Sequence, residues 1–289
     1  MSHDQARNLR REMGSTRNFR EAKTIAFASG KGGAGKSNIA LNFSLALLNH
    51  DKKVLLFDLD FGMGNLDILL GMETEATIVD MFKGHLPIHD IIQTGPGGLE
   101  YVAAGSGLND IFTLEQDEKN HFFRQYEALI HLYDYIIFDM GAGATHDLLS
   151  FIMASDECIV VTTPEPTSIT DAYGMIKHIV NNNPDLPISV IMNRAKSDKY
   201  GQQALERFRR IIVQFLAIDI RKLGTLPDDK TVSAAVLRQI PYLFLDEKAA
   251  ISKALRKLAA NYLTDQSLTK GNSSSFTFVQ KLKKFMLER

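Results

Sequence analysis

The chain has 289 residues, of which 45% are hydrophobic and 23% are charged. These values are ordinary for a soluble globular protein, and the formal net charge of -1 gives no overall positive field that would favour nucleic acid. Cys158 is the only cysteine, which excludes a disulfide framework and suits a reducing cytoplasm. The start lacks the apolar core of a signal peptide, and no stretch approaches the roughly 20 apolar residues that span a bilayer. We therefore expect a cytoplasmic protein whose length allows one sizeable core.

Residues 1–23 are polar and locally basic. Ala6, Leu9 and Met13 recur at helical spacing, so a short helix with a thin apolar stripe could form. The composition is equally compatible with a disordered tail.

A candidate phosphate-binding loop at residues 30–37 lies between an apolar run at 25–28 and an amphipathic helical pattern that reaches residue 49. Its glycines would let backbone N–H groups turn towards an anion, and the positive end of the helix dipole would add to their effect. We expect Lys36 to reach the β- and γ-phosphates and the Ser37 hydroxyl to complete the shell of a Mg2+ ion. The alternative is a glycine-rich turn that binds nothing. The candidate nucleotide-binding residues here are Gly30, Gly32, Gly33, Ala34, Gly35, Lys36, Ser37 and Asn38.

Two further apolar runs, at residues 54–57 and 135–138, each end in acidic residues. Asp58 and Asp60 follow the first run, and Asp139 follows the second. Open α/β sheets bind ligands at the carboxyl ends of their strands, so these residues lie at a candidate ligand site, and Asp139 could hold a Mg2+-bound water. Capping of the following turn is the alternative role for Asp58 and Asp60.

The remaining pattern alternates apolar strand-like runs with helical stretches. Runs are expected at 99–105, 158–163 and 188–192, with helices at about 117–132, after Ser168, at about 202–216 and near 247–263. Such alternation predicts an α/β fold in three layers, a doubly wound and mostly parallel sheet. One domain is expected to occupy residues 24–263.

Residues 264–275 have the composition of a linker, and residues 276–289 are expected to form an amphipathic, basic helix. Its apolar positions are Phe278, Val279, Leu282, Phe285 and Met286. Lysines beside a phenylalanine-rich face suit an anionic membrane surface. Packing of the helix on its own domain is the alternative.

The string Gly-Lys-Gly-Gly-Ala-Gly-Lys-Ser resembles the deviant Walker A loop of the MinD/ParA family of ATPases. The resemblance implies the P-loop NTPase fold, binding of ATP and Mg2+, slow regulatory hydrolysis, and a homodimer when ATP is bound. It gives catalytic roles to Lys31, which would cross the dimer interface, to Lys36, and to Asp60, which would orient the attacking water. It also places Asp58 near the water shell of the Mg2+ ion. It also implies a switch II glycine and a set of base-contacting residues. These further nucleotide-binding residues are Gly143, Asn193, Arg194, Pro227 and Asp229.

The N-terminal run Asp-Gln-Ala-Arg-Asn-Leu-Arg at residues 4–10 resembles an element of the FlhG family, also called FleN or YlxH. The resemblance implies control of flagellar number and placement, and stimulation of an FlhF-type GTPase. Flagellar basal-body (C-ring) proteins are further implied partners, with reversible attachment to the inner face of the bacterial cell membrane. The residues implied in GTPase activation are Asp4, Gln5, Ala6, Leu9 and Arg10.

Other members of the wider family define the alternatives. A DNA-partition or cell-division-site ATPase would share the loop, and Arg207, Arg209 and Arg210 could form a nucleic-acid patch. A solvated helix face is the expected explanation of these arginines, so a nucleic-acid partner is not expected. An electron-transfer reductase that holds a cluster between subunits needs two cysteines per subunit, which a single Cys158 excludes.

Overall fold

The computed structural model of the protein describes residues 21–61, 64–105, 114–141, 146–268 and 277–287. The strands are β1 (Lys23–Ala28), β2 (Val54–Leu59), β3 (Gln93–Thr94), β4 (Glu100–Val102), β5 (Tyr135–Met140), β6 (Glu157–Thr162), β7 (Ile188–Ala195) and β8 (Arg221–Pro227). They form one eight-stranded sheet in the order β3-β4-β2-β5-β1-β6-β7-β8. Every neighbouring pair is parallel except β3 with β4. The expected doubly wound, mostly parallel sheet is confirmed.

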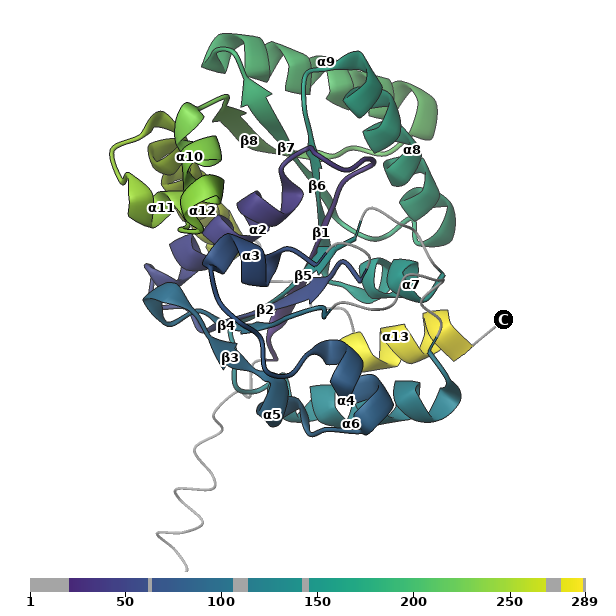
Figure 1. Cartoon of the computed structure of the whole chain (residues 1–289). Helices are drawn as coiled ribbons and strands as arrows, with labels where there is room; N and C mark the ends of the chain where they lie inside the picture. Colours follow the sequence, from purple (N-terminus) through teal and green to yellow (C-terminus); the bar gives the residue numbers. More distant parts are fainter. Residues whose placement is uncertain (1–20, 62–63, 106–113, 142–145, 269–276, 288–289) are drawn as a thin grey trace, which may run out of the picture.

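Helices cover both faces of the sheet (Figure 1). One face carries α4 (Ile78–Gly84), α5 (Ile88–Ile91), α6 (Gln116–Leu129), α7 (His146–Ala154), α8 (Pro166–Asn182), α9 (Asp198–Leu216) and α13 (Phe278–Leu287). The other face carries α2 (Lys36–Leu48), α3 (Leu66–Leu70), α10 (Lys230–Arg238), α11 (Tyr242–Leu245) and α12 (Ala250–Leu268). A short 3-10 helix (Pro96–Gly98) joins β3 to β4. The central strands are therefore buried on both faces, which explains their continuous apolar sequences.

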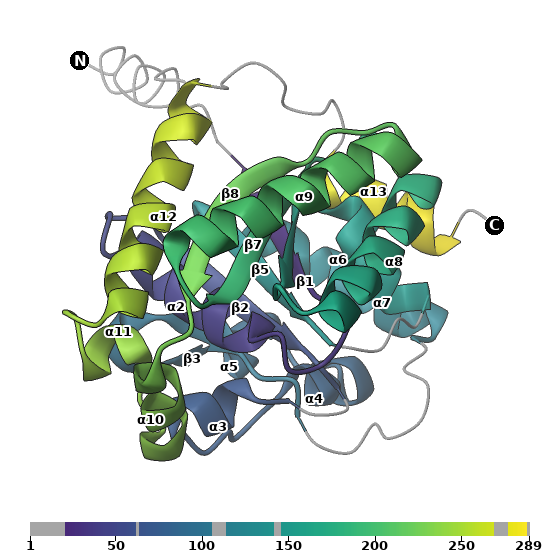
Figure 2. The same cartoon turned by 90° about the horizontal axis from the view of Figure 1, so that it is seen from above.

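The carboxyl end of β1 leads into the candidate phosphate loop and then into α2. Figure 2 shows α2 lying across the sheet with α10, α11 and α12 beside it. The side-chain carbonyl of Asn42, in the middle of α2, accepts a hydrogen bond from the backbone N–H of Leu243 in α11 (3.1 Å). The helix that follows the loop is thus held by buried contacts along its length.

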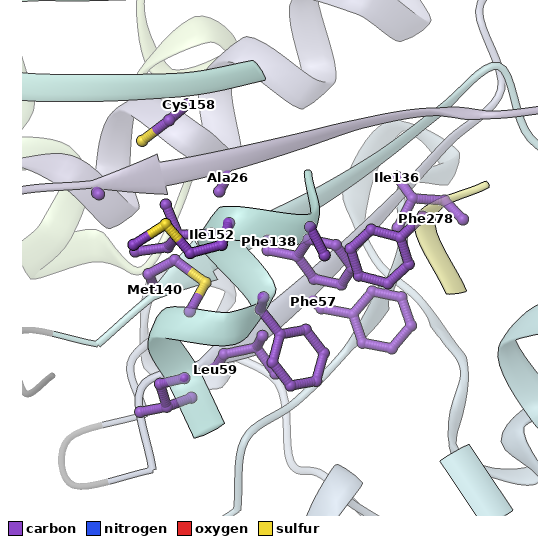
Figure 3. Close-up of a cluster of buried hydrophobic side chains, with 14 of the residues drawn as sticks. Ala26, Phe57, Leu59, Ile136, Phe138, Met140, Ile152, Cys158 and Phe278 are labelled. Carbon is purple, nitrogen blue, oxygen red and sulfur yellow. The ribbon is translucent and has the colours of Figure 1, made fainter. Parts of the chain in front are cut away.

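The C-terminal helix α13 is docked on the domain, with its apolar face turned inward. Phe278, Val279, Leu282 and Met286 are buried, and Phe285 is partly buried against the same core. The Phe278 ring lies 4.6 Å from that of Tyr126 and 5.2 Å from that of Phe138, between ring centroids. Figure 3 shows Phe278 among the core side chains beside Phe138. The expectation of a membrane-facing surface therefore does not describe this state, because the sheet offers an apolar site that the sequence pattern could not reveal.

Two charged contacts complete the docking of α13. The Lys281 ammonium lies 2.7 Å from the Asp156 carboxylate, and the Lys283 ammonium lies 3.6 Å from that of Glu127. Asp156 also accepts hydrogen bonds from the N–H and hydroxyl of Thr24 in β1 (2.9 and 2.8 Å). Two of the basic residues expected to face lipid headgroups, Lys281 and Lys283, therefore form ion pairs within the protein.

Helix α12 extends five residues beyond the expected domain end at residue 263. Its last turns are polar, yet Asp265 forms an ion pair with Arg221 of β8 (2.6 Å). The hydroxyl of Thr264 donates to the carbonyl of Ala260 (3.0 Å). The expected linker at 264–275 is therefore helical through Leu268, and residues 269–275 lie outside the described part. None of the helices that the structure describes has the length and apolarity to cross a bilayer.

A buried carboxylate, Glu157, joins four elements at the amino end of the sheet. It pairs with Lys23 of β1 (2.6 Å) and accepts hydrogen bonds from the hydroxyls of Ser189 in β7 and Tyr262 in α12. Only 4% of its side chain is exposed. Removal of one partner from such a group leaves a charge without compensation in a poorly hydrated place.

We expect Glu157→Gln to lower the free energy of unfolding by about 3 kcal/mol, because the Lys23 charge loses its partner. The control is Glu247→Gln, which removes a carboxylate that is 68% exposed and 3.6 Å from Arg256. That change should cost about 0.5 kcal/mol or less. Urea unfolding followed by circular dichroism measures both. Equal losses for the two variants would mean that the Glu157 network adds no stability.

Candidate functional site

The loop between β1 and α2 has the backbone conformation that phosphate binding requires. Gly33 and Gly35 adopt φ values of 89° and 90°, a region that favours glycine. A Cβ on Gly35 would lie 2.5 Å from the amide nitrogen of Asn193. A Cβ on Gly33 would meet nothing within 4 Å, so this part of the loop is open. The four residues from Lys31 to Ala34 place their backbone at the carboxyl edge of the sheet, where an anion could reach it.

Lys36 is the most buried cation of this loop, and it forms a short ion pair with Asp139 at the end of β5. The Lys36 side chain is 6% exposed and that of Asp139 is 1% exposed. The Lys36 ammonium also lies 3.2 Å from the Ser37 hydroxyl. The structure therefore brings together three residues that the sequence assigned to phosphates and Mg2+.

Asp58 stands beside Asp139, because β2 and β5 are neighbours and these two residues are in register. Its carboxylate accepts hydrogen bonds from the backbone N–H groups of Asp60 (2.9 Å), Asn65 (2.9 Å) and Leu66 (3.2 Å). Burial and the neighbouring charge of Asp139 raise the pKa of Asp58 to about 7. Asp58 thus organises the loop before α3 and also supplies an acidic group to the site.

Asp60 lies against Gly141, at the start of the loop that follows β5. We call this loop the second switch segment, because it holds the switch II glycine of the family resemblance. A Cβ built on Gly141 would lie 3.1 Å from both the Cα and the Oδ1 of Asp60. The loops after β2 and β5 are therefore in direct contact. Gly143 lies outside the described residues, as do Asp4, Gln5, Ala6, Leu9 and Arg10 of the N-terminal segment.

The base-contacting candidates lie at the ends of β7 and β8, and two of them have structural partners. The Asn193 amide donates to the carbonyl of Ala34 in the loop (2.8 Å), so it positions that loop. The Asp229 carboxylate accepts from the N–H groups of Thr231 (2.9 Å) and Ile251 (3.1 Å), at the starts of α10 and α12. Arg194 is exposed with a φ of 54°. Pro227, which ends β8, is half-buried on the same edge.

One contact of the loop could not be read from the sequence. The backbone of α8 passes so close to Gly30 that a Cβ there would lie 2.1 Å from the carbonyl carbon of Asp171. Lys31 is exposed next to this contact, and its carbonyl accepts a hydrogen bond from the Ser29 hydroxyl (3.0 Å). The first glycine of the loop is therefore required by packing against α8 as well as by the turn.

The arginines of α9 belong to ion pairs on a solvated face. Arg209 pairs with Asp219 (2.6 Å), and Arg210 lies 3.4 Å from Glu206. Arg207 is exposed on the same helix. Two of the three charges are thus compensated by neighbours, which gives the nucleic-acid alternative little support.

The donor set suits a Mg2+ ion that is held jointly with a nucleotide. Within the described residues, no group of three or more His, Cys, Asp or Glu side chains is arranged to hold a metal ion. A hydroxyl from Ser37 and carboxylates from Asp58 and Asp139 nevertheless meet beside an open glycine loop. Mg2+ usually keeps waters and takes one or two carboxylates together with substrate phosphates, so these residues fit it.

The raised pKa of Asp58 predicts a pH effect on the nucleotide-free protein. Its folded pKa of about 7 exceeds the ordinary aspartate pKa of 3.8, so the folded state binds more protons than the unfolded state between these values. The stability that this group contributes is therefore present at acid pH and is lost as the pH rises through about 7. Between pH 5 and 7.5, we expect Tm of the wild type to fall relative to that of Asp58→Asn. Thermal unfolding at both pH values tests this, and parallel changes in the two proteins would contradict it.

Comparison with known proteins places this geometry in a family. The model of the CobQ/CobB/MinD/ParA nucleotide binding domain matches residues 25–242. The antiactivator FleN of Pseudomonas aeruginosa is 32% identical over 229 residues, which are 79% of this chain and 81% of FleN. The flagellum site-determining protein YlxH of Helicobacter pylori is 32% identical over 266 residues, which are 92% of this chain and 85% of YlxH.

A solved structure supports the same fold. The septum site-determining protein MinD of Pyrococcus horikoshii, complexed with Mg-ADP, has a TM-score of 0.68 and 24% sequence identity. The match covers 86% of this chain and 98% of that protein. Together with the glycine loop, the buried Lys36–Asp139 pair and the paired strand-end aspartates, these matches show that the chain belongs to the MinD/ParA family of P-loop ATPases, in the branch that includes FleN and YlxH.

Proposed function

We propose that this chain is an ATP-dependent, dimerising switch that regulates flagellar number and placement. The observation that carries the ATPase part is the buried Lys36–Asp139 ion pair beside an open glycine loop. Without nucleotide, the Lys36 ammonium is paired with the Asp139 carboxylate. When ATP binds, Lys36 would pair with its phosphates instead, so its buried charge would stay compensated. The glycine backbone and the dipole of α2 would complete the phosphate site.

Each residue of the site then has a defined task in hydrolysis. Ser37, Asp58 and Asp139 would hold Mg2+ and its waters, and the ion would neutralise charge that develops on the phosphates. Asp60 would orient the attacking water. Its contact with Gly141 lets the loop after β2 respond to the loop after β5. Lys31, which is exposed on the loop, would reach the nucleotide of a second copy.

The flagellar part rests on the similarity to FleN and YlxH and on the N-terminal element at residues 4–10. In this proposal that element stimulates an FlhF-type GTPase, and flagellar C-ring proteins are further partners. Asp4, Gln5, Ala6, Leu9 and Arg10 would make the contacts with the GTPase. The protein would be cytoplasmic and would attach reversibly to the inner face of the cell membrane.

Membrane attachment would use α13 after it leaves its docking site. Phe278 contacts Phe138, the residue before Asp139, and α13 also packs along α7, which follows the second switch segment. A movement of the loop after β5 on binding ATP would therefore weaken the site that holds α13. Two released helices in a dimer would bind lipid far more firmly than one, because the second helix attaches intramolecularly.

The test of this switch is co-sedimentation with liposomes that contain anionic lipid, in ADP and in a non-hydrolysable ATP analogue. We expect the full chain to bind only with the analogue. Lys284, which is exposed on α13, gives a variant that leaves the Lys281 and Lys283 ion pairs intact. Lys284→Glu should weaken the analogue-dependent binding at least about tenfold, because each basic residue near anionic lipid contributes about 1 kcal/mol and the dimer loses two of them.

The control is Lys248→Glu, which reverses an exposed charge before α12. It should bind liposomes as the wild type does. Light scattering of the same samples reports whether the analogue produces a dimer. A monomer in ATP and Mg2+ would contradict the dimer switch, and lipid binding that ignores both nucleotide and Lys284 would contradict the role of α13.

The GTPase part has a separate test. Gln5→Ala in the full chain should lower the stimulation of an FlhF-type GTPase at least about fivefold, because one hydrogen-bonding side chain contributes about 1 kcal/mol or more at a contact. ATP hydrolysis by the variant should equal that of the wild type. Ser2→Ala, outside the element, is the matched control. Full stimulation by Gln5→Ala would remove the element from the proposed activity.

A further inference from the structure

A cavity lies at the amino end of the sheet, at the edge opposite to the phosphate loop. Its volume is about 710 Å³, and it is lined by residues from the start of β2, from α5, from the β3–β4 region and from the turn before β5. Its walls combine apolar side chains such as Ile92 and Leu132 with Lys53 and Glu100. Leu132 is 49% exposed, so part of its apolar surface is open to a docking segment. Neither the nucleotide site nor the docking of α13 uses this cavity.

The N-terminal part of the chain enters the fold beside this cavity. The backbone N–H of Ala22 donates to the carbonyl of Ile130 (2.6 Å), and that of Lys23 donates to the carbonyl of Asp134 (2.9 Å). Leu132, which lines the cavity, lies between these two partners in the same turn. The first described residues of the chain therefore lie beside the cavity wall.

We propose that the N-terminal segment, residues 1–20, docks in this cavity of its own chain through Leu9 and Met13. These two residues and Ala6 recur at helical spacing and would give one apolar edge. Leu132 and Ile92 offer the apolar surface that this edge would cover.

The charges of the segment and of the cavity are compatible with this docking. The segment has five arginines and two acidic residues, so charges of both signs need partners. Asp51 and Glu100 line the cavity and can pair with arginines, while Lys52 and Lys53 can pair with Asp4 or Glu12.

The tether makes even weak docking effective. The chain from Leu9 to Glu21 has twelve Cα–Cα steps and can span about 40 Å when extended. The cavity begins at β2, two strand spacings or about 10 Å from β1. A short linker of this kind gives an effective concentration in the millimolar range, so a millimolar affinity would fill the cavity about half of the time.

Docking of the segment would control its access to the partner GTPase, an inference that rests on the proposed function. Docking through Leu9 would hold residues 4–10 against the domain and compete with capture by the partner GTPase. The activating element would then be withheld until the partner binds it more tightly than the cavity does. The docking itself can be tested without any GTPase.

The test is disulfide formation within the full chain, with Asn8→Cys, which leaves Leu9 and Met13 in place, combined with one cysteine on the domain. Lys53→Cys places it on the cavity wall, and Asp185→Cys is the matched control. Both positions are exposed. Lys53 precedes β2 and Asp185 precedes β7, and these two strands lie two places from β1 on opposite sides. The native Cys158 is buried and stays reduced in both. Peptide mass spectrometry of the oxidised monomer measures the bond.

We expect the bond to Lys53→Cys to form at least about tenfold faster than the bond to Asp185→Cys, since a tether alone would treat the two positions alike. Equal rates would overturn the proposal. A second pair, Gln5→Cys with Lys53→Cys, is measured with and without Leu9→Asp and Met13→Asp. The two aspartates should slow the bond to the rate of Gln5→Cys with Asp185→Cys. An unchanged rate would also overturn the proposal, because the apolar edge would then have no part in docking.

Discussion

The structure depends on how two buried carboxylates are compensated at the carboxyl edge of the sheet. Asp58 and Asp139 are neighbours on β2 and β5, and both side chains are almost fully buried. Like charges in such a place are costly, so Lys36 pairs with Asp139 while three backbone N–H groups bind Asp58. The geometry of the loop, of α2 and of the segment before α3 follows from satisfying these two groups.

This arrangement links the nucleotide site to distant surfaces through short paths. Asp58 binds the backbone that begins α3, and Asp229 binds the backbone that begins α10 and α12. Phe138, the residue before Asp139, contacts Phe278 of α13. Residues at this edge of the sheet are therefore joined to helices on both faces by direct contacts.

In the proposed membrane switch, the apolar face of α13 would have two environments, the docking site seen here and lipid. Burial of four large apolar side chains contributes about 1.5–3 kcal/mol each, an upper estimate that release of the helix would forgo. Lipid burial would return a similar amount, so the balance between the two states is set by smaller terms. The ion pairs of Lys281 and Lys283 and the packing on Phe138 are among these terms.

The fold class and the phosphate loop could be predicted from the sequence alone. Continuous apolar strands that end in Asp58 and Asp139, and glycines in fixed spacing before Lys36, carry local information that one chain displays. The contacts of Lys36 with Asp139 and of Asn193 with the loop join residues more than a hundred positions apart. Local sequence patterns could not predict them, because they form only when the strands assemble into the sheet. The same holds for α13, because an amphipathic pattern states that a face must be covered but not by what. The fold supplies the apolar site on β5 and α7, and this site decides where that face is buried in this structure.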